Sequence, residues 1–460
     1  MKTLRWLLPI AAIILVPAAV VAQQPAPVGG NFDQEYESGK TAFAAGDYRE
    51  AEKQFKTALA SSRQFASNDP RVVNTLRDLA QVYRAESKYA EAEPLMERAL
   101  LLRERSVGKF HPDLAKDIDE LGRICFAQMK FVSSEAYFKR ELGLVEKKYG
   151  PEYLDLVAVL TSVAQAEQAL NKNADAEAML KRAISIREKN QGPEHPDLAG
   201  DLTRLAQLYV AEAKYAEAEP VFQRAITIQE AQSGPNSPNL VTPLDNLATC
   251  YKEQDKFDKA EPLYLRAMSI REAVYGPSNP DLAQSLDNLA ALYVKQKRYN
   301  DAAPYYERAL QIRTTALGPE NQLVTNGLDR LAGVYTAQEK LVEAEPLYRQ
   351  SYTTHEKETL ASLRNLATLY VARQKYAEAD PLYKLALAIY DKDAPAAKKK
   401  ISKKDVGKVE PPPPYLVETL EEYAVVLRKL KRKGEASKLE SRAKPLRQLL
   451  AQLNTQTQAQ

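Results

Sequence analysis

The chain of 460 residues is poor in the side chains on which much enzyme chemistry depends. It contains three histidines, two cysteines and one tryptophan. No histidine accompanies a Ser or Cys nucleophile motif, no Cys/His cluster has metal-ligand spacing, and no glycine-rich phosphate-binding loop is present. We therefore expect a protein that is not an enzyme and that uses neither a metal nor a cofactor.

The sequence also lacks an excess of charge of one sign. Its 64 Lys and Arg residues are balanced by 61 Asp and Glu residues, which leaves a net charge of +3. Such an even balance gives no reason to expect nucleic acid as a partner.

Long apolar runs are missing except at the N-terminus. The segment "MKTLRWLLPIAAIILVPAAVVAQQ" has a basic start, an apolar run from Leu7, and small residues at Val20 and Ala22. This order is typical of a secretory signal cleaved after Ala22, so we expect a periplasmic or extracellular protein with no membrane span after cleavage. An uncleaved anchor is the alternative, although an apolar run of about 16 residues is short for a span.

What the chain does have is a strict internal repeat. A small residue recurs every 42 residues, at Ala92, Ser134, Ala176, Ala218, Ala260, Ala302 and Ala344. Ala51 precedes this series, and Ala379 and Ala436 continue it at altered intervals. The series defines about ten units, and a repeat of this length indicates stacked units rather than one globule.

Each unit contains two amphipathic segments. Between Pro196 and Gly234, apolar residues follow three-and-four spacing in two series: Leu198, Leu202, Leu205, Ala206, Leu208 and Tyr209, then Tyr215, Ala218, Phe222, Ala225, Ile226 and Ile228. Both series predict helices with one buried stripe, and no strand pattern competes. Because two helices cannot bury both stripes alone, we predict an all-α solenoid of stacked helix pairs.

Proline and glycine mark the ends of the predicted helices. Pro70, Pro112, Pro196, Pro238 and Pro280 are expected at the first position of first helices. This assigns the preceding His111 and His195 to helix boundaries rather than to a metal site. Glycines of the "GP" pairs are expected to end the second helices, at Gly192, Gly234, Gly276 and Gly318.

Six second helices contain a further proline, at Pro94, Pro220, Pro262, Pro304, Pro346 and Pro381. A proline inside a helix costs about 3 kcal/mol. We therefore expect the second helix of the unit with Pro220 to begin near Ala216 or Ala218, so that Pro220 lies in or at the end of its first turn.

The two cysteines, Cys125 and Cys250, lie at apolar positions of predicted helices three units apart. An exported protein could form a disulfide, but this separation is unfavourable for bridging geometry. We expect two buried, unpaired thiols.

The units resemble a known family. The segment "NPDLAQSLDNLAALYVKQKRYNDAAPYYERALQIRTTALGPE" (279–320) resembles the 42-residue tetratricopeptide repeats of the kinesin light chain type. The first unit, "YESGKTAFAAGDYREAEKQFKTAL", is similar to an ordinary tetratricopeptide repeat. The resemblance covers roughly residues 33–448. It implies an α-α superhelix, a non-enzymatic scaffold whose concave face, lined by first helices, holds peptides or partner segments.

The resemblance stops at the repeat array. An export signal, not a heptad-patterned segment, precedes the repeats. A motor function is therefore not implied.

Candidate binding residues occupy the position before the Leu-Ala pair of the first helices. Light-chain-like arrays resemble this chain in placing Asn and Arg there; the candidates are Arg204, Asn246, Asn288, Arg330 and Asn365. An asparagine offers a donor and an acceptor, so a row of them suits pairing with an extended backbone. The alternative is a solvated helix face with i,i+4 partners. Earlier units carry Asp78, Glu120 and Ser162 here, so units four to nine are predicted to bind better.

The patterns also give the domain organisation. We expect a signal peptide at 1–22, a linker at 23–32, repeats one to nine at 33–390, a Lys/Pro-rich insert at 391–414, a C-terminal repeat and cap at 415–448, and a polar tail at 449–460. The composition of the insert predicts disorder. Weak contact of its lysines with anionic surfaces is the alternative.

The functional hypothesis is a binding scaffold for a protein or peptide partner of unknown identity. The competing hypothesis is a self-associating structural array in the cell envelope, because the exposed ends of a solenoid can stack.

Overall fold

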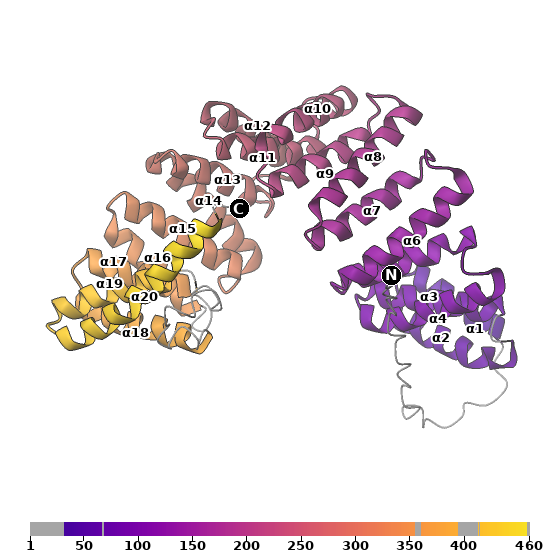
Figure 1. Cartoon of the computed structure of the whole chain (residues 1–460), viewed down its shortest axis with the longest axis horizontal. Helices are drawn as coiled ribbons and strands as arrows, with labels where there is room; N and C mark the ends of the chain where they lie inside the picture. The colour runs from indigo at the N-terminus through magenta and orange to yellow at the C-terminus, as the bar shows by residue number, and fades with distance from the viewer. Residues whose placement is uncertain (1–31, 67–68, 355–359, 394–412, 414, 458–460) are drawn as a thin grey trace, which may run out of the picture. The chain divides into compact units, whose positions relative to one another are not determined.

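A computed structural model describes residues 32–66, 69–354, 360–393, 413 and 415–457. Within these residues every regular element is helical, and consecutive helices form ten antiparallel pairs (Figure 1). The predicted all-α array of helix pairs is therefore confirmed. The expected signal peptide lies outside the described residues. So does the predicted 391–414 insert, apart from Asp391–Asp393, which end a helix, and Pro413.

The chain divides into two compact units, residues 1–193 and 194–460. The helices of unit 1 are α1 (Phe32–Ala44), α2 (Tyr48–Ser61), α3 (Pro70–Ala85), α4 (Tyr89–Val107), α5 (Ala115–Ala127), α6 (Phe131–Tyr149), α7 (Leu156–Ala169) and α8 (Asn173–Gln191). Short 3-10 turns, η1 (Ser62–Gln64) and η2 (Pro112–Leu114), follow α2 and precede α5.

Unit 2 contains six helix pairs. Its helices are α9 (Leu198–Ala211), α10 (Tyr215–Ser233), α11 (Val241–Glu253), α12 (Phe257–Tyr275), α13 (Leu282–Lys295), α14 (Tyr299–Leu317), α15 (Gln322–Ala337), α16 (Leu341–Thr354), α17 (Leu360–Ala372), α18 (Tyr376–Asp393), α19 (Leu416–Lys429) and α20 (Lys433–Thr457). The 3-10 turn η3 (Pro238–Leu240) precedes α11.

The small residues that define the repeat lie where paired helices meet. All ten are 0% exposed: Ala51, Ala92, Ser134, Ala176, Ala218, Ala260, Ala302, Ala344, Ala379 and Ala436. A side chain no larger than a hydroxymethyl group lets the two helices approach closely. Where serine replaces alanine, the Ser134 hydroxyl donates to the Gly122 carbonyl over 2.9 Å, so its polar group is satisfied. The repeat frame read from the sequence is thus also the packing frame.

The predicted apolar series form the core between helices. In α9 all six predicted residues are buried, and in α10 only Tyr215 of the six is partly exposed. Each first helix packs against its own second helix and against the second helix before it, as α11 does against α12 and α10. Neighbouring pairs therefore cover one another's apolar stripes, as a solenoid requires.

The prolines of the second helices lie deeper than predicted. Helix α10 begins at Tyr215, so Pro220 is its sixth residue and lies in the second turn. The cause is the turn inside each pair, where Ala213 has a φ of 56° and the Lys214 amide donates to the Tyr209 carbonyl over 2.8 Å. This turn fixes the helix start. Pro220 is exposed, so water can reach the carbonyl that loses its donor.

The prolines of the first helices also need a correction. Only Pro70 is the first residue of an α-helix, with the Asp69 carboxylate accepting from the Arg71 amide. Pro112 and Pro238 begin 3-10 turns, and Pro196 and Pro280 precede helices that start at Leu198 and Leu282. In each of these four cases a leucine amide bonds back three residues, as from Leu198 to the His195 carbonyl over 3.0 Å. A tight turn therefore comes before the helix.

The remaining boundary predictions are confirmed. Gly192, Gly234, Gly276 and Gly318 cap second helices with φ values between 78° and 95°. The Nδ1 atoms of His111 and His195 each accept a backbone amide two residues later at 3.3 Å, so both histidines cap turns.

Candidate partner-binding surface

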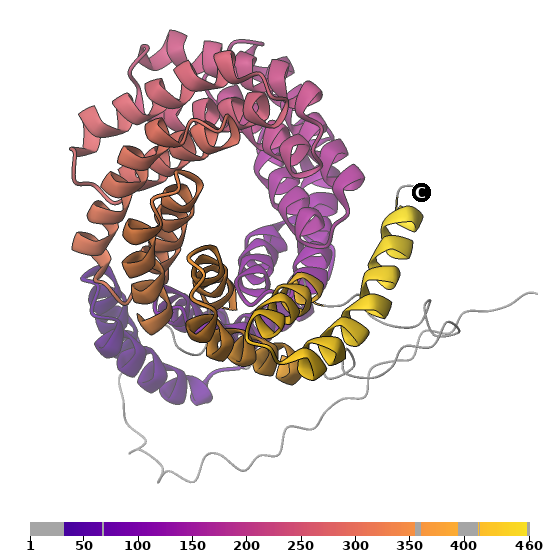
Figure 2. The same ribbon diagram turned by 90° about the vertical axis from the view of Figure 1, so that its left-hand side faces the viewer.

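The first helices of unit 2 lie side by side on one surface. Helix α11 contacts α9 and α13, and α17 contacts α15 and α19, whereas second helices in the described part of unit 2 approach one another less closely. The helix pairs of this unit follow a curved path (Figure 2). Helices that approach each other lie on the inner side of a curve. We call the exposed surface of α9, α11, α13, α15, α17 and α19 the inner face of unit 2.

The five predicted binding residues all lie on these first helices. Arg204 is on α9 and Arg330 on α15, with side chains 46% and 50% exposed. Asn246 on α11, Asn288 on α13 and Asn365 on α17 are half-buried. The residues therefore occupy equivalent places on successive first helices. Their role in binding stays a prediction.

Both arginines are held by buried carboxylates. The Arg204 guanidinium lies 3.3 Å from the Asp201 carboxylate, which is 5% exposed. The Arg330 guanidinium lies 2.5 Å from Asp287, which is 3% exposed and also pairs with Arg313 at 2.7 Å. A planar guanidinium has five N–H donors, so one bond to a carboxylate leaves others for a ligand. The ion pairs thus fix the arginines in place without using all their donors.

The asparagines differ among themselves. Asn288 accepts from the Gln284 side chain over 2.9 Å and lies close enough to the Asp245 carboxylate to lower the pKa of that group. The Gln284 contact is the i,i+4 arrangement expected for a solvated helix face. Asn246 and Asn365 form no side-chain hydrogen bond with any described residue. Their amide groups therefore keep a donor and an acceptor for a partner.

Asp245 lies beside this row and has an unusual titration. Burial raises the pKa of Asp245 to about 6, against the opposing effects of Arg271 and Asn288. Arg271 lies 3.2 Å from the Asp245 carboxylate. Burial likewise raises the pKa of Asp329, to which the Ser362 hydroxyl donates over 2.6 Å. Buried Asp245 on α11 and half-buried Asp329 on α15 thus both have raised pKa values.

A hollow of about 440 Å³ adjoins Arg204. Gly200, Thr203 and Gln207 of α9 line it together with Thr242 of α11. Residues of α10 and of the turn η3 complete the lining, so the hollow lies where α9, α10, η3 and the start of α11 meet.

In unit 1 the equivalent positions are engaged within the fold. The Tyr36 hydroxyl donates to Asp78 over 2.6 Å, Arg84 pairs with Glu120 at 2.7 Å, and Ser162 is 8% exposed. Unit 1 therefore does not continue the Asn and Arg row.

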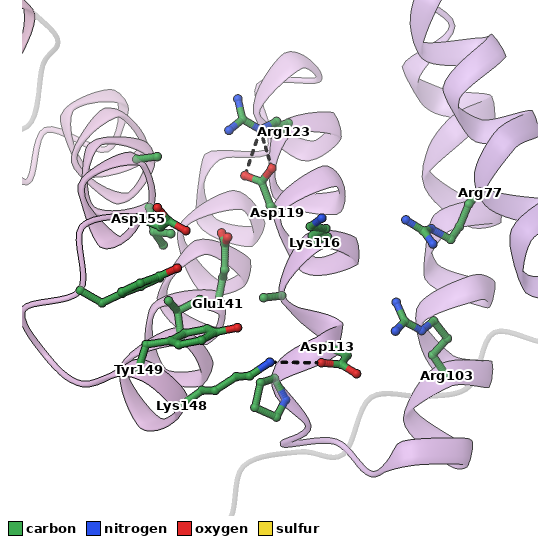
Figure 3. A pocket seen from close by; sticks show the side chains of 16 residues that line it. Arg77, Arg103, Asp113, Lys116, Asp119, Arg123, Glu141, Lys148, Tyr149 and Asp155 are labelled. Carbon is green, nitrogen blue, oxygen red and sulfur yellow. Dashed lines mark hydrogen bonds and ion pairs between the residues drawn. The ribbon is translucent and has the colours of Figure 1, made fainter. Parts of the chain in front are cut away.

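Unit 1 instead contains a larger cleft that the sequence reasoning missed. It has a volume of about 620 Å³ and lies among α3, α4, α5, α6 and the start of α7 (Figure 3). Charged side chains from six segments line it: Arg77, Arg103, Asp113, Lys116, Asp119, Arg123, Glu141, Lys148 and Asp155. Two tyrosines, Tyr149 and Tyr153, stack at its edge with ring centroids 4.4 Å apart.

The sequence does contain a signal for this cleft. Glu141 occupies the position where other repeats place Ala99, Ala183, Ala225, Ala267 and Ala309. These five alanines are 0% or 1% exposed, so a carboxyl group stands at a core position. The signal for Glu141 in the sequence is therefore its departure from the repeat: an acid stands where a recurring alanine is expected.

The cysteines are free and buried, as predicted. Burial raises the pKa of Cys125 to about 12 and that of Cys250 to about 11, so neither thiol is activated. Among the described residues, no three His, Cys, Asp or Glu side chains are placed to hold a metal ion. No described helix is long and apolar enough to cross a membrane.

The repeats of this chain match a known protein family. The model of the tetratricopeptide repeat family matches seven overlapping segments, at residues 35–105, 71–140, 114–189, 158–231, 198–273, 240–315 and 322–392. These matches span most of the described residues. No curated protein sequence matches the chain.

Several solved structures are similar to the chain. Nearly identical TPR-like repeats of a kinesin light chain from Podosopora anserina are 21% identical, cover 45% of this chain and 95% of their own, and give a TM-score of 0.41. BtubC (BKLC) from P. vanneervenii is 20% identical and covers 63% of this chain and 93% of its own, with a TM-score of 0.35. The C-terminal part of a TPR repeat-containing protein from Cytophaga hutchinsonii is 15% identical and covers 64% and 99%, with a TM-score of 0.42.

Proposed function

We propose, from the premise that this chain belongs to the tetratricopeptide repeat family, that it is a scaffold that holds an extended segment of a protein partner on the inner face of unit 2. Members of the family generally mediate protein–protein interaction. For this chain we propose in addition that the partner binds on the inner face of unit 2, that Asn and Arg side chains recognise it, and that the chain has no catalytic activity.

The observation that carries the proposal is the row of half-buried asparagines on α11, α13 and α17. Packed helices lie about 8–10 Å apart, and an extended chain rises about 3.3 Å per residue. A segment that crosses the successive helices α9 to α17 would therefore meet one asparagine or arginine of this row about every third residue. Because Asn246 and Asn365 have no side-chain partner among the described residues, each can bond a backbone amide of the segment.

The arginines add a preference for acidic or carbonyl-rich segments. Arg204 and Arg330 flank the asparagines of α11 and α13, and their buried carboxylate partners keep them in fixed positions. Fixed donors lose little conformational entropy on binding, which favours affinity.

The test is co-purification from the native envelope with the full chain and a variant in which Asn246, Asn288 and Asn365 are changed to Ala. We expect the variant to fold and to capture less of the partner than the unchanged chain. The matched control changes Thr227, Ser269 and Gln311 to Ala. These are exposed residues at equivalent places on the second helices α10, α12 and α14. Equal capture by the asparagine variant and the control would exclude this inner-face site.

We also propose that the chain is exported and that its signal is cleaved after Ala22. Trp6 is the only tryptophan, so the mature protein should show no tryptophan fluorescence. N-terminal sequencing of protein from the envelope fraction tests the cleavage position, and a sequence that begins at Met1 would contradict it.

A further inference from the structure

The cleft of unit 1 contains a cation and an acid that have no ion pair with any described residue. Five cations line it, and four of them already pair with carboxylates. Arg77 and Arg103 both hold the fully buried Asp117, Arg123 holds Asp119 at 2.8 Å, and Lys148 lies 3.5 Å from Asp113. The fifth, Lys116, forms no ion pair with any described residue.

Glu141 is the acid left without a partner. It is 7% exposed, and its Oε2 atom is fully buried and accepts no hydrogen bond. No ion pair joins it to a described residue. In Figure 3 its carboxyl group points into the space between α5 and the start of α7. A buried carboxyl without a partner is costly, and such a group in a cleft indicates a ligand site.

The charged and titratable groups around Glu141 come from each neighbouring element. Helix α5 contributes Lys116, Asp119 and Arg123, the turn η2 contributes Asp113, the segment before α7 contributes Tyr153 and Asp155, and α6 itself contributes Lys148 and Tyr149. Burial raises the pKa of Glu141 to about 8, with a smaller contribution from the Asp119 charge and an opposing one from Arg123. Near neutral pH the carboxyl therefore keeps its proton until a cation replaces it.

We propose that the cleft of unit 1 is a second binding site, which receives a lysine or arginine side chain of a protein partner, and that Glu141 is the carboxylate that pairs with it. The acids Glu141 and Asp155 line the cleft together with Tyr149 and Tyr153, whose rings stack on each other. An alkyl chain can lie along these rings while its charged end reaches Glu141. Lys116 is then free to pair with an acidic group of the same segment.

This site is independent of the inner face of unit 2, because all of its lining residues belong to unit 1. The asparagine variant described above should therefore leave it intact. A variant that loses binding at the inner face of unit 2 and keeps binding at the cleft of unit 1, or the reverse, would show that the two proposals stand or fall separately.

The test uses the full chain and three synthetic peptides: acetyl-Gly-Lys-Gly-amide, the same peptide with Arg, and the same peptide with uncharged norleucine. Ligand-detected NMR titration at pH 8 measures binding. We expect the Lys and Arg peptides to bind and the norleucine peptide to bind at least about tenfold more weakly, because a charge-assisted hydrogen bond is lost.

Glu141→Gln should weaken binding of the charged peptides by about tenfold or more. The matched control is Glu97→Gln, since Glu97 on α4 also has a pKa raised by burial but does not line the cleft. Unchanged binding by Glu141→Gln, or equal binding of the norleucine peptide, would overturn the proposal.

The unmodified protein provides a second measurement that does not depend on a variant. Because the cation needs the ionised carboxylate, affinity for the Lys peptide should fall roughly tenfold for each pH unit below about 7. Release of a proton on binding, measured by calorimetry in buffers of different ionisation enthalpy, should accompany this dependence. Affinity that does not change between pH 6 and pH 8 would contradict the role of Glu141.

Discussion

At the scale of single residues, Glu141 is an acid at a position that all other repeats fill with alanine, except one that has Ser351. Its pKa of about 8 exceeds the ordinary value of 4.5, so the folded protein binds this proton more tightly than the unfolded chain does. The linked stability is fully present below about pH 4.5 and is lost as the pH rises towards 8. Glu141 therefore gives the protein a pH-dependent stability in addition to the ligand contact proposed above.

Glu141→Gln should remove this dependence. The difference in unfolding free energy between the variant and the unchanged chain should grow from pH 5 to pH 8, by up to about 1.4 kcal/mol per pH unit, in favour of the variant. Denaturant unfolding of the full chain across this range measures it. Parallel curves for the two proteins would show that Glu141 titrates normally.

The repeat alanines allow a second test at this scale. Ala260 is 0% exposed between α11 and α12. Ala260→Leu should overpack this contact and lower the unfolding free energy by about 1–3 kcal/mol. A melting temperature equal to that of the unchanged chain would be inconsistent with the packing frame.

At the scale of elements, the helix pair is the unit that the sequence specifies well. The apolar series and the alanines of α9 and α10 predict which faces are buried, because side-chain size and spacing decide this locally. The start of α10 is less predictable. A residue of positive φ, Ala213, sets it, and a non-glycine residue in that conformation leaves little trace in the sequence.

The two candidate binding sites also differ in how far the sequence predicts them. The asparagine row follows from the repeat frame and could be predicted. Glu141 can be recognised in the sequence as a departure from the repeat, but the cleft around it cannot, because the cleft depends on ion pairs between repeats, such as that of Arg77 on α3 with Asp117 on α5. Such contacts join residues far apart in the chain, and periodicity alone does not show them.

Pro220→Ala tests the position of the helix start. Pro220 is the sixth residue of α10 and is exposed, so alanine can restore a backbone donor within the helix without disturbing the core. The unfolding free energy should rise by about 1 kcal/mol, less than the roughly 3 kcal/mol of a fully interior proline. A loss of stability would instead place Pro220 in the first turn.

At the scale of the whole molecule, most contacts join helices that are adjacent in the chain. An array held together by neighbour contacts presents terminal repeats that could stack between copies. The scaffold hypothesis predicts a monomer, whereas a structural array predicts association. Small-angle scattering of the mature chain over a concentration series should give a constant mass, and a mass that rises with concentration would favour the array.

The proposed partner surface can be tested most directly by site-specific photo-crosslinking. A photoreactive residue is placed at Asn288 on the inner face of unit 2, and in a second protein at Ser269, an exposed residue of α12. Irradiation in the native envelope should join one partner through a single extended segment at position 288 and not at position 269. Equal crosslinking at both positions, or crosslinking only at 269, would contradict binding on the inner face.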